Sequence, residues 1–332
     1  MPSAQLADWL WHLERVHPRT IALGLERVAT VYSRLALRFN VPVITVAGTN
    51  GKGSTCRMLE SCLEAAGYRV GCYFSPHLFE FRERIRVAGK DVDDASICRA
   101  LASVEAARRD VPLTYFEFAT LAALQIFAAA DLDALILEVG LGGRLDAVNI
   151  VDPDVSILTN VALDHQDYLG DSREEIGHEK AGVFRPGRPA VCADDAPPLS
   201  VLAHARALGA DLVRIGHDFG YREDSQQWAY WSRRGNRGGL AFPALRGRRQ
   251  LRNAATVFAA LERLEHRLPV SAQALRSGLA EVSLPGRFQV LPGEPMVIVD
   301  VAHNPAAAEV LAENLAALPR RARTLAVVGM LR

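Results

Sequence analysis

A glycine-rich stretch at residues 43–55 (VITVAGTNGKGST) constrains this chain more than any other feature. It begins as a β-branched run typical of a strand, continues as a loop with three glycines, and leads into a helical pattern at residues 56–66. Glycine lets the backbone approach an anion closely, and the N–H groups at a helix N-terminus favour negative charge. Lys52 adds a mobile positive charge, and Ser54 or Thr55 adds a hydroxyl for a metal ion. The stretch therefore predicts a nucleoside-triphosphate site.

The loop departs from the general P-loop pattern at two positions. That pattern has glycine five residues before Gly51, where this chain has Val46. It also has Ser or Thr directly after Lys52, where this chain has Gly53. A glycine-rich strand–helix turn that binds nothing is the alternative interpretation. The strand–loop–helix context favours the nucleotide site.

The composition is typical of a soluble globular chain of about two domains. The chain has 332 residues, of which 49% are hydrophobic and 23% are charged, and its formal net charge is zero. Zero net charge and the lack of a basic block give no support for a nucleic-acid partner. The longest apolar runs, at 118–130 and 134–137, are too short or too interrupted to span a bilayer, so no membrane association is expected. The N-terminus lacks the layout of a signal peptide.

Cysteine and lysine usage add two indications. The five cysteines are odd in number and form no C-x-x-C pair, which favours a reducing cytoplasm over a disulfide framework or a zinc site. Only three of the 38 basic residues are lysine, namely Lys52, Lys90 and Lys180. A need for a primary amine or a compact charge would explain why lysine persists there. Chance also explains a set of three.

Strand and helix patterns alternate along most of the chain. The predicted strands cover residues 43–47, 69–74, 134–139, 155–159 and 189–192, and the predicted helices cover 4–16, 23–37, 56–66, 93–108, 116–130, 173–183, 253–263 and 272–282. This alternation predicts an α/β fold with a doubly wound, mostly parallel sheet of the P-loop type. In such a sheet, ligands bind beyond the carboxyl ends of the strands.

Residues 214–250 break this pattern. Glycine, arginine and aromatic residues alternate there, which predicts a small β-ribbon of two or three antiparallel strands. We expect turns at 234–236 and 237–239. The arginines are compatible with RNA, but the neutral total charge favours a solvated ribbon.

The last part of the chain predicts the start of a second α/β domain. Residues 284–287 (LPGR) resemble a hinge. A strand at 296–300, a helix at 306–318 and a strand at 324–328 predict one βαβ unit. One such unit cannot bury a core. We therefore expect domains at 1–287 and 288–332, with the second incomplete.

Polar side chains follow neighbouring predicted strands. Glu138 ends one strand beside a glycine-rich loop, and His165 lies in the loop after the next. A carboxylate is a suitable ligand for Mg²⁺, and the position of Glu138 and His165 near a phosphate loop favours a metal site. Ser75, after the second strand, offers a hydroxyl ligand. The alternatives are a salt-bridged glutamate, a structural histidine and a turn serine.

Four further residues are candidates for the site. Lys180 lies in a predicted helix, where the alternative is an exposed lysine paired with a neighbouring glutamate. Arg287 at the hinge is suited to clamp phosphate oxygens. Asp300 and His303 flank a strand end in the second domain and would meet the nucleotide from across a cleft.

Together these motifs resemble the Mur-ligase superfamily, and within it the dihydrofolate synthase/folylpolyglutamate synthase family. The motifs are GTNGKGS at 48–54, SPHL at 75–78, TYFE at 114–117, EVGLGGRLD at 138–146, LDH at 163–165, EKAG at 179–182, LPGRF at 284–288 and DVAHNP at 300–305. They occur in the family's order from about Thr20 to the last residue.

The resemblance implies ATP-dependent amide ligation. A substrate carboxylate would attack the γ-phosphate of ATP to form an acyl phosphate, which the amino group of L-glutamate would then attack. The implied substrates are dihydropteroate and (poly)glutamyl folates, and the implied enzyme is bifunctional. The implied metal is Mg²⁺, in two sites. We expect a monomer.

The resemblance also implies roles for individual residues. The catalytic residues would be Lys52, His165 and Lys180, with Lys180 carbamylated to help hold the second metal. ATP would contact Gly48, Thr49, Asn50, Gly51, Lys52, Gly53, Ser54, Asn253, Arg287, Asp300 and His303. The metal ligands would be Ser54, Ser75, Glu138 and His165. The pterin-bearing substrate would lie along Ala22, Leu23, Gly24, Thr114, Tyr115, Phe116, Glu117, Leu145, Asp146 and Ala147.

Two departures from the family matter. Ala22 stands where some relatives have Asp, which puts one pterin contact in doubt. Family members continue for roughly another 100 residues, so we expect much of the glutamate-binding domain to be missing and ligation to be poor. The alternative functions are another Mur-type ligase, such as one acting on a cell-wall precursor, and a catalytically silent nucleotide or folate binder.

Overall fold

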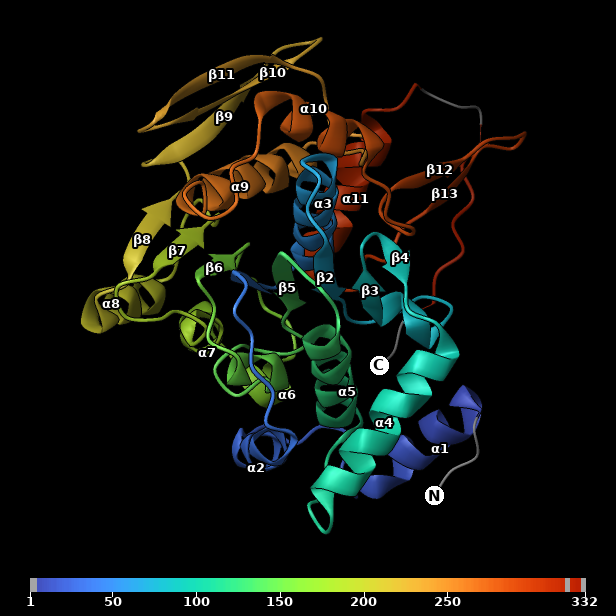
Figure 1. Ribbon diagram of the computed structural model, residues 1–332. Coiled ribbons are helices and arrows are strands. Elements are labelled where there is room, and N and C mark those ends of the chain that lie inside the picture. The colour runs from blue at the N-terminus through green and yellow to red at the C-terminus, as the bar shows by residue number, and fades with distance from the viewer. Residues whose placement is uncertain (1–4, 320–322, 330–332) are drawn as a thin grey trace.

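A central sheet of eight strands organises the computed structural model, which describes residues 5–319 and 323–329. The strand order within these residues is β4-β3-β2-β5-β1-β6-β7-β8 (Figure 1). The strands are β1 (Val43–Ala47), β2 (Val70–Tyr73), β3 (Ile85–Val87), β4 (Lys90–Asp91), β5 (Ala134–Glu138), β6 (Val155–Leu158), β7 (Pro189–Cys192) and β8 (Asp211–Arg214). All pair in parallel except β3 and β4, which add an antiparallel hairpin at one edge.

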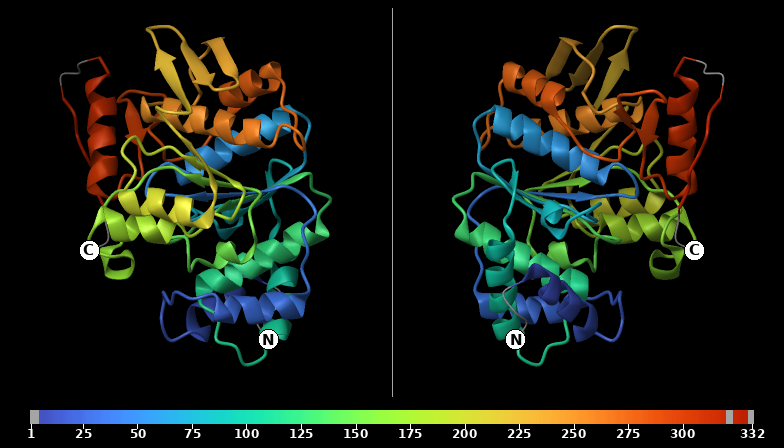
Figure 2. Two further views of the ribbon diagram at one scale, coloured as in Figure 1. Left: turned by 90° about the vertical axis from the view of Figure 1, so that its left-hand side faces the viewer. Right: turned by 90° about the vertical axis from the view of Figure 1, so that its right-hand side faces the viewer.

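Helices cover both faces of this sheet, as Figures 1 and 2 show. One face packs against α1 (Leu6–Val16), α2 (Glu26–Leu35), α4 (Asp94–Arg108), α5 (Tyr115–Ala129), α7 (Arg173–Ala181) and α8 (Leu199–Leu208). The other packs against α3 (Lys52–Ala65), α9 (Arg249–Arg263) and α10 (Ala272–Glu281). Val43 and Ile44 of β1 therefore enter cores on opposite faces. Burial on both faces explains the nearly continuous apolar runs, and the predicted doubly wound α/β fold is confirmed.

The predicted β-ribbon is also present. Its strands are β9 (Phe219–Glu223), β10 (Trp228–Ser232) and β11 (Gly235–Leu240), all antiparallel. The predicted turn at 237–239 is wrong, because these residues lie inside β11. Trp228 pairs with Leu240 but Tyr230 pairs with Arg237, so β11 carries an extra residue. Gly239 has a φ of 65°, and the glycines form a β-bulge where we expected a turn.

The chain after the hinge differs from the prediction. It forms a hairpin of β12 (Gln289–Leu291) and β13 (Val297–Val299), followed by α11 (Pro305–Ala316). The predicted βαβ unit is wrong, because β13 pairs antiparallel with the unpredicted β12 and residues 324–328 form no strand. Leu325 and Val328 are 76% and 73% exposed, and no described strand pairs with their backbone. The domain boundary at 287/288 stays a prediction.

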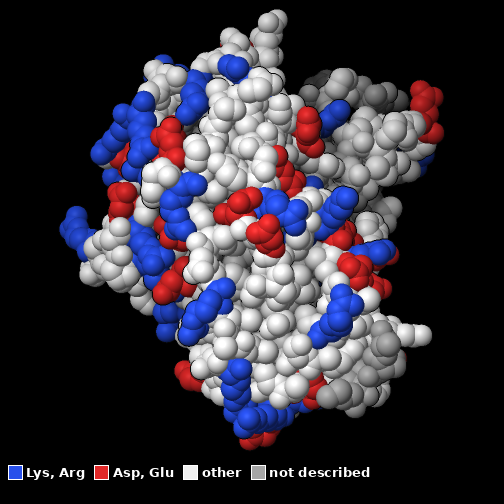
Figure 3. Space-filling model, viewed as in Figure 1, with Lys and Arg blue, Asp and Glu red and all other residues white. Residues whose placement is uncertain are grey.

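The surface carries both signs of charge. Figure 3 shows acidic side chains interspersed with Lys and Arg, which gather along the left edge near β8 and the β-ribbon. Within the described residues, no helix is both long and apolar enough to cross a bilayer.

Candidate active site

The glycine loop between β1 and α3 is shaped by groups from neighbouring elements. α3 begins at Lys52, earlier than the sequence predicts, so its first N–H groups face the loop. Gly48 has a φ of 143°, and a Cβ there would lie 1.9 Å from Thr159 Oγ1. Gly51 has a φ of 86°, and a Cβ there would lie 2.9 Å from Asn253 Oδ1. Both positions require glycine, and the loop presents its backbone to the cavity.

Two lysine side chains converge on one carbonyl of this loop. Lys52 Nζ donates to Gly48 O at 3.1 Å and to Thr49 O at 3.2 Å, and Lys180 Nζ donates to Gly48 O at 3.2 Å. Burial, aided by the charge of Lys52, lowers the pKa of Lys180 to about 7. The alternative of an exposed Lys180 is wrong, since it is 4% exposed and Glu179 pairs with an arginine. Near neutral pH the Lys180 amine is thus uncharged in a large fraction of molecules.

Oxygen atoms suited to bind a metal ion line the same cavity, on Glu138 and Ser75. Glu138 is the last residue of β5 and is 3% exposed, and its Oε2 accepts a hydrogen bond of 3.1 Å from Ser75 N. Burial raises the pKa of Glu138, and the charge of Lys52 opposes this. Ser75 Oγ is buried without a hydrogen-bond partner. A buried carboxylate beside an unpaired hydroxyl fits Mg²⁺ or a similar hard cation.

His165 lines the same cavity as Glu138 and Ser75. It precedes the short helix α6 (Gln166–Leu169) with a φ of 51°, and burial lowers its pKa, which favours the neutral ring that metals bind. Its nearest carboxylate is Asp164, at 4.0 Å. No cluster of three or more His, Cys, Asp or Glu suited to a metal occurs in residues 5–319 and 323–329.

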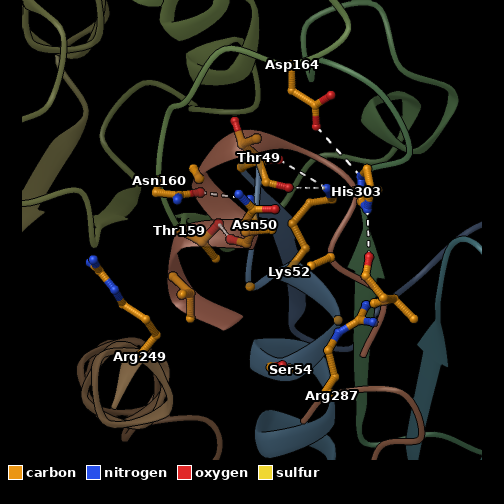
Figure 4. A pocket seen from close by; sticks show the side chains of 18 of the residues that line it. Thr49, Asn50, Lys52, Ser54, Thr159, Asn160, Asp164, Arg249, Arg287 and His303 are labelled. Carbon is orange, nitrogen blue, oxygen red and sulfur yellow. Dashed lines mark hydrogen bonds and ion pairs between the residues drawn. The ribbon is translucent and has the colours of Figure 1, made fainter. Parts of the chain in front are cut away.

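These groups line a cavity of about 310 Å³ at the carboxyl ends of the parallel strands. Figure 4 shows Lys52 central in it, with Arg249 and Arg287 on either side of the loop. Its wall includes residues that the sequence did not single out, namely Thr159, Asn160, Asp164, Arg246, Arg249, Gln250 and Arg252. Arg249 and Arg252 lie three positions apart in α9 and so share one face of this helix, a spacing that the sequence offered as a signal, whereas Arg246 precedes the helix.

Asn253 and Ser54 are linked through a third side chain. Gln250 Nε2 donates to Ser54 Oγ at 3.4 Å, and Asn253 Nδ2 donates to Gln250 Oε1 at 2.9 Å. Thr55 instead donates to Gly51 O at 2.9 Å, within its own helix. Of the two hydroxyls proposed for the metal, only that of Ser54 faces the cavity.

The segment after residue 286 forms the far wall of the cavity. Arg287 and His303 line it, together with Asp300. Burial lowers the pKa of Arg287, and the charges of Glu138 and Asp300 oppose this. The Asp300 carboxylate accepts hydrogen bonds of 2.8 Å from Phe288 N and Ala302 N. Asp300 thus fixes the backbone around Arg287.

Asn304, which the sequence did not single out, ties this wall to the glycine loop. Its Nδ2 donates to Asn50 Oδ1 and to Asp164 Oδ2, both at 3.0 Å, while Asn50 Nδ2 donates to Asn304 Oδ1 at 3.1 Å. Asn50 N donates to Asn160 Oδ1 at 2.8 Å. Asn304 Oδ1 also accepts from Ala307 N and caps α11. One amide therefore links three segments of the cavity wall.

The residues predicted to bind the pterin come together at a second place. Thr114 and Glu117 form a capping box at the start of α5. Arg27, missed in the sequence, pairs with Glu117 at 2.8 Å. Gly24 N donates to Leu145 O at 3.4 Å. Three predicted segments thus meet, and they also contain Ala22, Leu23, Tyr115, Phe116 and Ala147.

Asp146 connects this second place to the cavity. Its buried carboxylate accepts from Leu141 N at 2.8 Å and Val148 N at 3.0 Å, and burial raises its pKa to about 6. Leu141 lines the cavity, whereas none of the predicted pterin residues does. The cavity and the predicted pterin segments are therefore adjacent but separate.

Known proteins are similar to this chain in sequence and in fold. The Mur ligase middle domain matches residues 46–261, and the glutamate ligase domain of Mur ligases matches residues 286–332. The dihydrofolate synthase/folylpolyglutamate synthase of Escherichia coli is 50% identical over 330 residues, which cover 99% of this chain and 77% of that protein.

Two solved structures are similar to this chain in three dimensions as well. E. coli FolC in complex with DHPP and ADP superposes with a TM-score of 0.95 at 50% identity, over 100% of this chain and 79% of that one. A bifunctional folylpolyglutamate synthase/dihydrofolate synthase with Mn, AMPPNP and L-glutamate bound superposes with a TM-score of 0.88 at 50% identity. The match covers 95% of this chain and 76% of that one. The chain therefore belongs to the dihydrofolate synthase/folylpolyglutamate synthase family of the Mur ligases.

Proposed function

We propose that this chain joins L-glutamate to the carboxylate of dihydropteroate and of (poly)glutamyl folates, at the expense of ATP. One observation carries the proposal. The glycine loop, Lys52, buried Glu138 and the unpaired hydroxyl of Ser75 line one cavity beside the predicted pterin segments. Relatives at 50% identity hold DHPP with ADP, or AMPPNP with Mn and L-glutamate.

The chemistry takes two steps. A carboxylate oxygen of the pterin substrate attacks the γ-phosphorus of ATP, and the bond from that phosphorus to ADP breaks. The amine of L-glutamate then attacks the acyl carbon, phosphate leaves with the bridging oxygen, and the nitrogen loses a proton to solvent. Lys52 and the loop N–H groups stabilise the charge on the transferring phosphoryl group.

Mg²⁺ would be held by Glu138, Ser75 and His165, with Ser54 nearer the nucleotide, and it would neutralise phosphate charge. A second Mg²⁺ would use a carbamate on Lys180. That carbamate forms when the neutral amine attacks CO₂ and loses a proton. The pKa of about 7 and the burial of Lys180 support this assignment. An arginine could not react in this way.

The assay for this proposal is ADP release with dihydropteroate and L-glutamate. We expect ADP only when both are present with ATP, and none when a UDP-sugar peptide, the substrate class of a cell-wall ligase, replaces dihydropteroate. ADP that forms without either substrate, or only with the UDP-sugar peptide, would contradict the proposal. Dihydropteroate binding without ADP release would indicate the silent binder. The monomeric state, the cytoplasmic location, the lack of a nucleic-acid partner and the boundary at 287/288 stay predictions.

A further inference from the structure

Arg84 is a buried cation without an acidic partner. It ends the 3₁₀ helix η1 (Phe81–Arg84) and is 9% exposed. Its guanidinium donates to His77 Nδ1 at 2.8 Å and lies 5.8 Å and 5.7 Å from the ring centres of Phe81 and Tyr115. No carboxylate of the described residues pairs with it, although neighbouring Arg82 and Arg86 both form ion pairs.

The protein compensates only part of this charge. A buried cation without a carboxylate is costly, and ring faces and a histidine lone pair offset that cost incompletely. His77 accepts this bond through the lone pair of Nδ1, as a neutral imidazole does. The one hydrogen bond from the guanidinium to His77 leaves several N–H groups of Arg84 for another acceptor.

Arg84 lies between the two parts of the site. Tyr115, over which it stacks, belongs to the predicted pterin segment at the start of α5. On the other side, Arg84 O accepts from Phe74 N, and the next residue, Ser75, donates its N–H to Glu138 of the proposed metal site. His77 and Tyr115 are both partly exposed, so the guanidinium lies one side chain below the surface.

The loop that carries Arg84 is preorganised. The Glu83 carboxylate accepts from Leu78 N at 2.7 Å, Phe79 N at 2.9 Å and Glu80 N at 2.7 Å. Phe74 N donates to Arg84 O at 2.8 Å, which fixes the backbone to the end of β2. A fixed guanidinium loses little freedom when it binds a planar carboxylate.

We propose that Arg84 binds the carboxylate of the pterin substrate, the group that attacks ATP. This inference rests on the proposed function. One carboxylate oxygen pairs with the guanidinium while the other attacks the γ-phosphorus. The paired oxygen remains the carbonyl oxygen of the acyl phosphate, and it gains negative charge when the glutamate amine adds. Arg84 thus acts in substrate binding and in the second step.

The test compares two ligands on three proteins by titration. The ligands are dihydropteroate and an analogue that lacks the carboxylate. The proteins are wild type, Arg84→Met, and Arg82→Met as the exposed control on the same short helix. We expect Arg84→Met to raise the Kd for dihydropteroate about 10- to 100-fold and to leave the Kd for the analogue unchanged. Arg82→Met should bind both ligands like wild type.

Three results would overturn the assignment. Equal weakening of both ligands by Arg84→Met would show that Arg84 only shapes the pocket, and no weakening would show that it does not bind the carboxylate. ADP binding that equals wild type verifies that the variant is folded, and Arg84→Lys provides a conservative replacement if the methionine variant fails to fold. Failure of wild type to bind dihydropteroate would overturn the proposed function together with this inference.

Discussion

The glycine loop and the segment after residue 286 face the same cavity but are held in place by different forces. β1 is buried along its whole length, and α3 has nine buried residues. By contrast, α11 has none. Its connection to the loop runs through polar side chains, chiefly Asn304 to Asn50 and Asp164. The glycine-loop side of the cavity is therefore preformed by the core, whereas the far wall depends on a few directional bonds.

The largest expected effect is on the preformed side. Lys52→Ala removes the charge that we propose faces the transferring phosphoryl group, and we expect ligation to slow by about 10²- to 10³-fold. Lys90 offers a matched control because it is an exposed lysine in β4. Lys90→Ala should leave the rate of ADP formation unchanged. A loss of less than about tenfold for Lys52→Ala would remove Lys52 from the chemistry.

The next effect is on the pH dependence of stability, and it arises from Lys180, again on the preformed side. Because the folded pKa of Lys180 is about 7 and the ordinary value is 10.5, the unfolded chain binds more protons between these pH values. The contribution of Lys180 to stability therefore rises with pH across this window, by up to about 1.4 kcal/mol per unit, and the full penalty remains below pH 7. Lys180→Met should flatten this rise in urea unfolding at pH 7, 8 and 9 without CO₂.

Lys90→Met is the control for that experiment and should follow the wild-type curve. An equal rise with pH in Lys180→Met and wild type would show that burial does not lower the pKa of Lys180. Its predicted carbamylation would then lose its main support.

A smaller effect is expected on the far wall. Asn304→Ala removes the links to Asn50 and Asp164 and the cap of α11, and we expect ATP to bind about 5- to 10-fold more weakly. Global stability should change little, because α11, which Asn304 caps, has no buried residue. Nucleotide titration measures the effect on ATP binding, and urea unfolding measures the effect on global stability. A large loss of stability with unchanged ATP binding would show that Asn304 supports the fold and not the far wall of the ATP site.

The smallest effect is expected in α11 itself. Leu315 is 39% exposed, so Leu315→Ala should change the free energy of unfolding by less than about 0.5 kcal/mol. The matched change in α3, Leu59→Ala, should cost about 2–5 kcal/mol, because Leu59 is fully buried. Similar costs for both substitutions, measured by urea unfolding, would show that α11 is stabilised as strongly as the core.

The parts of the site that are local in sequence were predictable. The glycine loop follows one buried strand and Glu138 ends another, and the apolar runs mark where these strands end, so the sequence places both at one edge of the sheet. The glycines at 238 and 239 misled the prediction because a bulge and a turn demand the same backbone freedom. Residues 324–328 have a strand-like composition, but a strand also needs a partner.

The contacts that span the chain were not predictable. Arg27 pairs with Glu117 across 90 positions, and Asn304 meets Asn50 across 254. No local pattern reports such pairs. Lys180 lies among charged neighbours, so the composition of this segment suggested a solvated helix face. Its burial becomes visible only when α7 packs against the glycine loop.

The transfer of carboxylate oxygen to phosphate tests the central claim most directly. Dihydropteroate labelled with ¹⁸O in its carboxylate is incubated with the chain, ATP and L-glutamate, and the released phosphate is analysed by mass spectrometry. We predict one ¹⁸O atom in each phosphate, because the attacking carboxylate oxygen becomes the bridging oxygen that leaves with phosphorus. Unlabelled phosphate formed together with the glutamate adduct would contradict phosphoryl transfer to the carboxylate at this site.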